Sequence, residues 1–235
     1  MATLDLQATE YMQYMELIIL ELRKRNFPSR EIAFPALCAF RIRASISSAK
    51  ILIENDLIHD ALSCLRSALE TAIILVGYYR IPDFKRRRRL DNIKDSKDLF
   101  SIRLEASLFS EIETEEVIRN NIDQIESELK ENHNNGITPF GNIHAVADGC
   151  NILPLKKRFY KLLCMSTHPS TKTLLKYAVN STPPVFIDYP EKDNSDYLSE
   201  LIYNIIVITA SILNEKLLLG IKKIPSVEEL VETLK

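Results

Sequence analysis

Apolar residues at three- and four-residue steps recur along most of the chain, and this periodicity constrains the fold more than any other feature. It predicts helices over residues 5–25, 32–55, 57–80, 110–132, 144–148, 155–167, 170–178, 196–219 and from residue 226 onward. Only VFIDY at residues 185–189 alternates as a strand would, and it lies between two prolines. The chain has 5 Gly among 235 residues, which disfavours a turn-rich β fold. We predict one all-α helical bundle of seven to nine helices, a single domain with its core in residues 30–220.

Polar residues and one proline mark where several of these helices begin. Pro35 is compatible with a helix only near its start, so we place it in the first turn. Ser110 with Glu113, and Ser226 with Glu229, have the spacing of capping boxes. Each signal predicts a helix start close to the residue that marks it.

Two segments interrupt the apolar pattern. Residues 83–108 are strongly charged and contain five successive cations, Lys85, Arg86, Arg87, Arg88 and Arg89. On a helix such a run would spread around the cylinder, so we interpret it as a solvated linker; the alternative is a nucleic-acid-binding patch that contacts phosphates. Residues 180–194 are rich in proline and are predicted to form a surface loop.

Composition and charge exclude several classes of protein. The net charge is only −2, so any contact with nucleic acid must come from a local patch. Neither GxGxxG nor GxxxxGK[ST] occurs. The N-terminus has early acids and no basic signal-peptide region, and the most apolar stretch, residues 197–213, is shorter than the ~20 apolar residues of a membrane span. We therefore expect a cytoplasmic protein without membrane contact, in which this stretch is a buried core helix.

The four cysteines are not arranged for metal binding. Cys38, Cys64, Cys150 and Cys164 form no CxxC or similar close spacing. Free thiols in a reducing cytoplasm are the expected state, and we predict neither a metal site nor a cofactor.

Two predicted helices are mostly apolar but carry polar residues at helical spacing. In the third helix Arg66 and Glu70 are four residues apart, and in the helix over residues 155–167 and just beyond it Tyr160, Cys164 and His168 follow at steps of four. Polar groups on an apolar helix are costly to bury unless they are paired. If the two helices pack together, Arg66, Glu70, Tyr160 and His168 form one polar site. The alternatives are an ordinary solvent-facing ion pair for Arg66 and a hydrogen-bonded structural corner for His168.

The sequence around these residues resembles a family of uncharacterised helical bacterial proteins with a domain of unknown function. LRSALETAIILVGYY is similar to the family's Arg-x-x-x-Glu helix, which continues as an apolar run. AVADGCNILPLKKRFYKLLCMSTHPST looks like its second signature, Tyr-x-x-x-Ser-x-x-x-His-Pro-Ser. The matching positions are Tyr160, His168, Pro169 and Ser170. Cys164 stands where the family usually has Ser, and the resemblance covers roughly residues 35–215.

That family is in turn similar to the HEPN proteins (higher eukaryote and prokaryote nucleotide-binding). These are helical bundles, many of them ribonucleases in toxin–antitoxin and anti-phage defence systems. Their hallmark is Arg, four to six residues, then His on one helix, whereas nine residues separate Arg158 from His168 here. The resemblance therefore implies a HEPN-like fold, a class of activity and a homodimer, but it assigns no catalytic residue.

Two hypotheses from different classes follow. In the first, the protein is a metal-independent ribonuclease: His168 is the general acid or base, Arg66 stabilises developing charge, and Glu70 and Tyr160 orient these two side chains. In the second, the same four residues form a buried network that fixes helix register, and the protein is a non-catalytic binding or regulatory module. The partners expected are RNA, a protein from the same operon, and a second copy of the chain.

Overall fold

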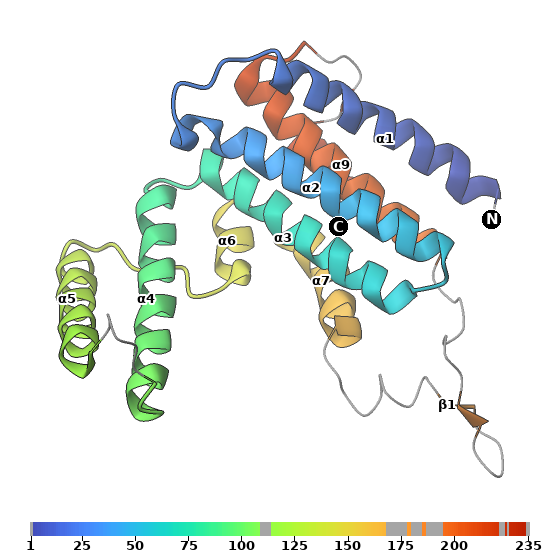
Figure 1. Ribbon diagram of the computed structural model, residues 1–235. Coiled ribbons are helices and arrows are strands. Elements are labelled where there is room, and N and C mark those ends of the chain that lie inside the picture. Colours follow the sequence, from blue (N-terminus) through green and yellow to red (C-terminus); the bar gives the residue numbers. More distant parts are fainter. Residues whose placement is uncertain are drawn as a thin grey trace.

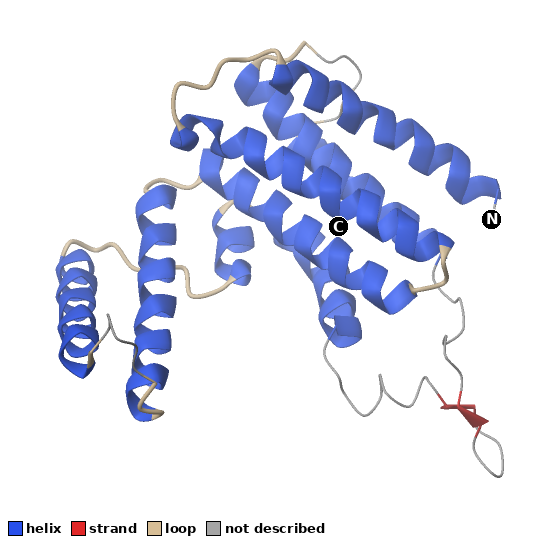
Figure 2. Ribbon diagram, in the orientation of Figure 1, coloured by secondary structure: helices blue, strands red, loops and turns tan. Residues whose placement is uncertain are grey.

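The computed structural model describes residues 2–108, 114–167, 178–179, 185–186, 195–220, 224 and 226–233. Within these residues the chain forms nine helices and one pair of two-residue strands (Figures 1 and 2). The elements are α1 (Ala2–Arg23), α2 (Arg30–Glu54), α3 (Ile58–Arg80), α4 (Phe84–Glu105), α5 (Glu115–Asn134), α6 (Ile143–Gly149), α7 (Leu153–Thr167), β1 (Ala178–Val179), β2 (Val185–Phe186), α9 (Ser195–Leu217) and α10 (Val227–Thr233). The predicted all-α bundle of seven to nine helices is confirmed.

Helix α3 is the centre of the bundle (Figure 1). It packs against α2, α9, α7 and α6, and its C-terminal end meets α4. Its buried residues are almost all aliphatic: Ala61, Leu62, Leu65, Ala68, Leu69, Ala72, Ile73, Leu75, Val76 and Gly77. Helices α1 and α10 pack on α9. Because so much of α3 is covered, only one face of it, between α2 and α7, reaches the surface.

Helix α9 is the buried core helix that the sequence predicts. An almost unbroken run of its side chains, residues 204–213, is buried. The segments Ile58–Arg80 and Tyr197–Leu217 are long and apolar enough to cross a membrane, yet 56% and 72% of their most apolar windows are buried inside the bundle. Core helices of a globular protein are buried to this extent, because their apolar surface packs against other helices.

The start of α2 differs from the prediction. Ser29 caps the helix by accepting a hydrogen bond from the backbone nitrogen of Ile32 at 3.3 Å, so the helix begins at Arg30. Pro35 is consequently the sixth residue of α2 and lies in the second turn, so its predicted place in the first turn was wrong. Its ring nitrogen has no hydrogen to donate to the carbonyl four residues earlier, and the helix continues regardless.

The charged segment is a helix rather than a linker, which corrects the preferred interpretation. α4 pairs with α5 in a helical hairpin that stands away from the main bundle (Figure 1). The start of α5 also moves: Thr114 caps it, accepting a hydrogen bond from the backbone nitrogen of Val117 at 3.4 Å, so it begins at Glu115. The proposed box of Ser110 and Glu113 lies outside the described residues.

The last third of the chain matches the prediction in part. α7 begins two residues earlier than expected and carries Pro154 in its first turn, where proline is well tolerated. Most of the helix expected over residues 170–178 lies outside the described residues, and Ala178 belongs to β1, which pairs antiparallel with β2. The predicted capping box of α10 is confirmed, since Ser226 and Glu229 exchange hydrogen bonds at 2.6 and 3.1 Å.

Candidate functional site

Helices α3 and α7 pack together, and three of the predicted site residues meet between them. The Arg66 Nε donates to Glu70 Oε1 at 3.0 Å, and the Tyr160 hydroxyl donates to the same oxygen at 2.6 Å. Arg66 Nη2 also donates to the Tyr160 hydroxyl oxygen at 3.3 Å. The guanidinium lies 5.3 Å from the centre of the Tyr160 ring. Each side chain of this Arg66–Glu70–Tyr160 cluster therefore bonds to the other two, and the cluster joins two helices that are far apart in sequence.

The cluster is half-buried and still reaches solvent. The side chain of Arg66 is 25% exposed and that of Glu70 is 33% exposed. A fully exposed ion pair of this spacing would contribute little to stability, whereas a completely buried one would be inaccessible to a substrate. Arg66 is therefore neither a simple surface residue nor an inaccessible one.

Burial and mutual hydrogen bonding shift the proton equilibria within the cluster. Burial raises the pKa of Tyr160 well above its usual value, and the hydrogen bond to Glu70 raises it further. Burial alone lowers the pKa of Arg66, but the hydrogen bonds to Glu70 and Tyr160 outweigh this effect, so its pKa is raised. At neutral pH Tyr160 consequently keeps its proton and donates it in a hydrogen bond to Glu70, beside the fixed cation of Arg66.

Two neighbouring side chains were not found from the sequence. The Lys156 ammonium lies 4.7 Å from the centre of the Tyr160 ring and 2.8 Å from the Nδ1 of His144. Burial lowers the pKa of Lys156, which favours loss of its proton. Lys156 precedes Tyr160 by four residues, a spacing that would have signalled a shared helix face, but His144 comes from α6 and carries no such local signal.

Of the other two residues at this spacing on the predicted helix, Cys164 and His168, the structure describes only Cys164. Cys164 is half-buried on α7, one turn beyond Tyr160. His168 lies outside the described residues and follows directly in sequence on Thr167, the last residue of α7. Three of the four predicted site residues are thus brought together, and the placement of His168 stays a prediction.

All five successive cations have intramolecular partners, and four of them contact residues outside α4. Lys85 lies over the Tyr78 ring at 5.3 Å, and Arg87 lies 3.9 Å from the centre of the Phe140 ring while its Nε donates to the Thr138 carbonyl. Arg88 pairs with Asp91 at 3.1 Å. Most of the run therefore anchors α4 to other parts of the chain, which the linker interpretation did not predict, and the nucleic-acid-binding interpretation stays a prediction.

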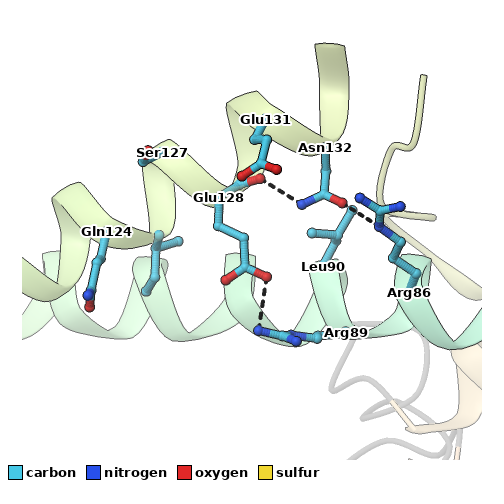
Figure 3. Close-up of a pocket in the computed structure, with 9 residues that line it drawn as sticks. Arg86, Arg89, Leu90, Gln124, Ser127, Glu128, Glu131 and Asn132 are labelled. Atoms are coloured by element: carbon cyan, nitrogen blue, oxygen red, sulfur yellow. Dashed lines mark hydrogen bonds and ion pairs between the residues drawn. The ribbon is translucent and has the colours of Figure 1, made fainter. Parts of the chain in front are cut away.

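Figure 3 shows how Arg86 and Arg89 reach toward α5. Arg86 Nε donates to Asn132 Oδ1 at 2.7 Å, and Arg89 pairs with Glu128 at 3.1 Å. Asn132 in turn donates to the Glu128 carbonyl at 2.8 Å. A polar hollow of about 670 Å³ lies between the two helices at this point. Its cationic side chains are largely occupied by α5, so the hollow is better suited to holding the hairpin together than to binding an anion.

Two of the four thiols are kept unreactive by burial, and the described part of the chain has no metal-binding cluster. Burial raises the pKa of Cys38 and of Cys150 to about 12, which keeps both thiols protonated and unreactive. Among the described residues, no group of three or more His, Cys, Asp or Glu side chains is placed to hold a metal ion.

Comparison with known proteins places the chain in a family. No curated protein and no solved structure matched it. A family model described as "Family of unknown function (DUF5677)" matches residues 33–183, well over half of the chain and a range that includes both signature segments. The chain therefore belongs to this family of unknown function.

Proposed function

We propose that the protein is a HEPN-like ribonuclease that cleaves RNA at a site built on the Arg66–Glu70–Tyr160 cluster. The observation that carries this proposal is the meeting of a fixed guanidinium, a carboxylate and a neutral tyrosine from two helices at a point that still reaches solvent. A positioned cation in a half-buried site stabilises charge on a phosphoryl group more strongly than it would in water.

The proposed roles follow from the chemistry of RNA. The ribose 2′-hydroxyl loses its proton to a base and attacks the adjacent phosphorus, while the 5′-oxygen leaves and takes up a proton; the products are a 2′,3′-cyclic phosphate and a 5′-hydroxyl. His168 is the general acid or base, and Arg66 faces the negative charge that develops on the phosphoryl oxygens. Glu70 and Tyr160 hold Arg66 in place, as their hydrogen bonds to it indicate.

The resemblance to HEPN proteins supports the same class of activity and suggests a biological setting. Many members of that group act in toxin–antitoxin or anti-phage defence systems. By analogy, we propose a protein from the same operon as a partner of this chain, and a homodimer as its assembly. Because the HEPN Arg–His spacing is missing, the site proposed here combines residues of two helices instead of one motif.

A cleavage assay with matched histidine variants tests the proposal. Purified wild-type, His168→Ala and His133→Ala proteins are incubated with total cellular RNA and labelled tRNA in EDTA. His133 is an exposed residue in the last turn of α5 and serves as the control. The wild type and the control should cleave, and His168→Ala should be slower by about 10²-fold or more. Cleavage by His168→Ala at the wild-type rate would refute the proposed role.

A second candidate function is a non-catalytic binding or regulatory module, and one observation favours it. The three side chains of the cluster satisfy one another, as they would in a network that fixes the register of α3 against α7. This hypothesis predicts no RNA cleavage by the wild type, together with a lower melting temperature when any member of the cluster is removed.

A further inference from the structure

A groove of about 810 Å³ opens between α2, α3 and α4, one turn along α3 beyond the cluster. Its floor is apolar and includes Phe34, Leu37 and Tyr78, and its rim is cationic and includes Arg30, Lys85 and Arg86. The residues that line it include five cations and no carboxylate. An apolar floor beneath a basic rim is complementary to a ligand that has both a flat apolar part and a negative charge.

Much of the positive charge around the groove is not neutralised. Arg88 and Arg89 have carboxylate partners, but Arg86 is bonded to the neutral amide of Asn132. Lys85 lies over an aromatic ring, and neither it nor Arg30 forms an ion pair with any side chain that the structure describes. The rim therefore attracts anions even though the protein as a whole carries a net charge of −2.

The floor offers aromatic and aliphatic surface at the same place. The Phe34 and Tyr78 rings are 5.1 Å apart, and Leu37 is 53% exposed. Proteins that bind single-stranded nucleic acid combine such surface, against which bases pack, with a basic groove that follows the backbone. The competing ligand is an acidic helix of a partner protein, whose carboxylates would pair with the cations of the rim. Such a helix would make no specific use of the two neighbouring aromatic rings.

The groove and the cluster lie on one continuous row of α3. Arg66, Glu70, Ile74 and Tyr78 follow one another at steps of four residues, so they form a single row on its exposed face. Arg66 and Glu70 belong to the cluster, whereas Ile74 and Tyr78 line the groove. The row from Arg66 to Tyr78 is about 18 Å long, at 1.5 Å per residue, which is within the reach of a few nucleotides of extended RNA.

We propose that this groove binds the single-stranded RNA segment next to the bond that is cleaved. A base packs against Phe34, Leu37 and Tyr78, and neighbouring phosphates contact Arg30 and Lys85, so that the strand continues along α3 to Arg66. This inference rests on the proposed ribonuclease function, and it assigns binding to residues outside the cluster.

The test measures binding separately from cleavage. The probe is a fluorescein-labelled 2′-O-methyl single-stranded oligonucleotide, which lacks the free 2′-hydroxyl that cleavage needs, and binding is followed by fluorescence anisotropy over a range of salt. The groove variants are Arg30→Gln combined with Lys85→Gln, and Leu37→Glu. The matched control is Lys94→Gln combined with Lys157→Gln, which removes the same charge from exposed positions outside the groove.

We expect the control to bind like the wild type. The double groove variant should bind about fivefold or more weakly. The dependence of log affinity on log salt should also become shallower, its negative slope shrinking in magnitude by about 1.4, because each phosphate contact contributes about −0.7 to that slope. Leu37→Glu should weaken binding about tenfold or more. Equal binding by groove variants and control, or no binding by the wild type, would overturn the proposal; in the second case an acidic peptide becomes the occupant to test.

Parallel cleavage assays keep the two proposals apart. If the wild type cleaves RNA and the groove variants bind and cleave normally, the groove proposal fails and the proposed function stands. If the groove variants lose binding but the wild type never cleaves, the groove binds RNA and the proposed chemistry fails.

Discussion

The hydroxyl group of Tyr160 links α7 to α3 by hydrogen bonds. That hydroxyl donates to Glu70 and accepts from Arg66, so Tyr160→Phe removes two hydrogen bonds and leaves the ring in place. We expect the free energy of unfolding to fall by about 1–2 kcal/mol, since each of the two net hydrogen bonds contributes about 1 kcal/mol or less at a half-buried site. Urea denaturation of the two proteins measures the difference, and a variant as stable as the wild type would show that the hydroxyl contributes nothing to folding.

The raised pKa of Tyr160 makes a separate prediction about pH. Its pKa in the folded protein lies above the unperturbed value of 10.0, so the stabilising contribution is complete below pH 10 and is lost as the pH rises above it, because the unfolded chain releases the proton first. The wild type should therefore lose stability more steeply than Tyr160→Phe once the pH exceeds about 10. If the free energy of unfolding of the two proteins fell equally steeply with pH in this range, the raised pKa of Tyr160 would be contradicted.

Gly77 allows three elements to approach closely. A Cβ at this position would lie 2.7 Å from both Phe84 Cε2 and Val146 Cγ1, side-chain atoms of α4 and α6. Gly77→Ala should lower the free energy of unfolding by about 1–3 kcal/mol through overpacking. This loss exceeds the gain in stability that alanine provides through its higher helix propensity. Gly149→Ala is the matched control, because its Cβ would meet only the flexible end of Ile81 at 3.1 Å. Thermal unfolding that ranks Gly149→Ala as the more harmful change would contradict the packing.

At the scale of elements, Asp91 connects the α4–α5 hairpin to the bundle. This buried carboxylate accepts from the backbone nitrogen of Gly141 at 2.8 Å and from Arg88 at 3.1 Å. Asp91→Ala should lower the free energy of unfolding by about 2–3 kcal/mol, since a buried donor is left without its acceptor. Asp91→Asn keeps an oxygen for Gly141 and should be less harmful. Equal effects of both variants, measured by chemical denaturation, would mean that the hydrogen bond to the backbone is unimportant.

Apolar periodicity was sufficient to predict the helices whose stability depends on a buried face. It located α3 and α9 within a few residues, because both bury apolar stripes. It misjudged α4, where only Phe84, Leu90 and Asp91 are buried and the helix depends on polar contacts with α5. Those contacts join residues about 40 positions apart, and local spacing carries no information about them.

At the scale of the whole molecule, the sequence predicted which residues of the site could pair, and the fold determined which of them do. The spacing of Arg66 and Glu70 is visible in the sequence, as is that of Tyr160 with Cys164 and His168, and the family resemblance includes Tyr160 as well. The contact between them depends on α3 packing against α7, which no local pattern specifies. The sequence singled out the basic run that supplies four of the groove's five cations, but not the groove itself, because its lining comes from α2, α3 and α4.

The most direct test of the account is the single-turnover rate of RNA cleavage by Arg66→Lys. Lysine keeps the positive charge but lacks the planar fork with which Arg66 contacts Glu70 and Tyr160 together. The account predicts a rate about 10²-fold or more below that of the wild type, at a temperature at which circular dichroism shows both proteins to be folded. Cleavage by Arg66→Lys at the wild-type rate, or a folded wild-type protein that never cleaves RNA, would contradict it.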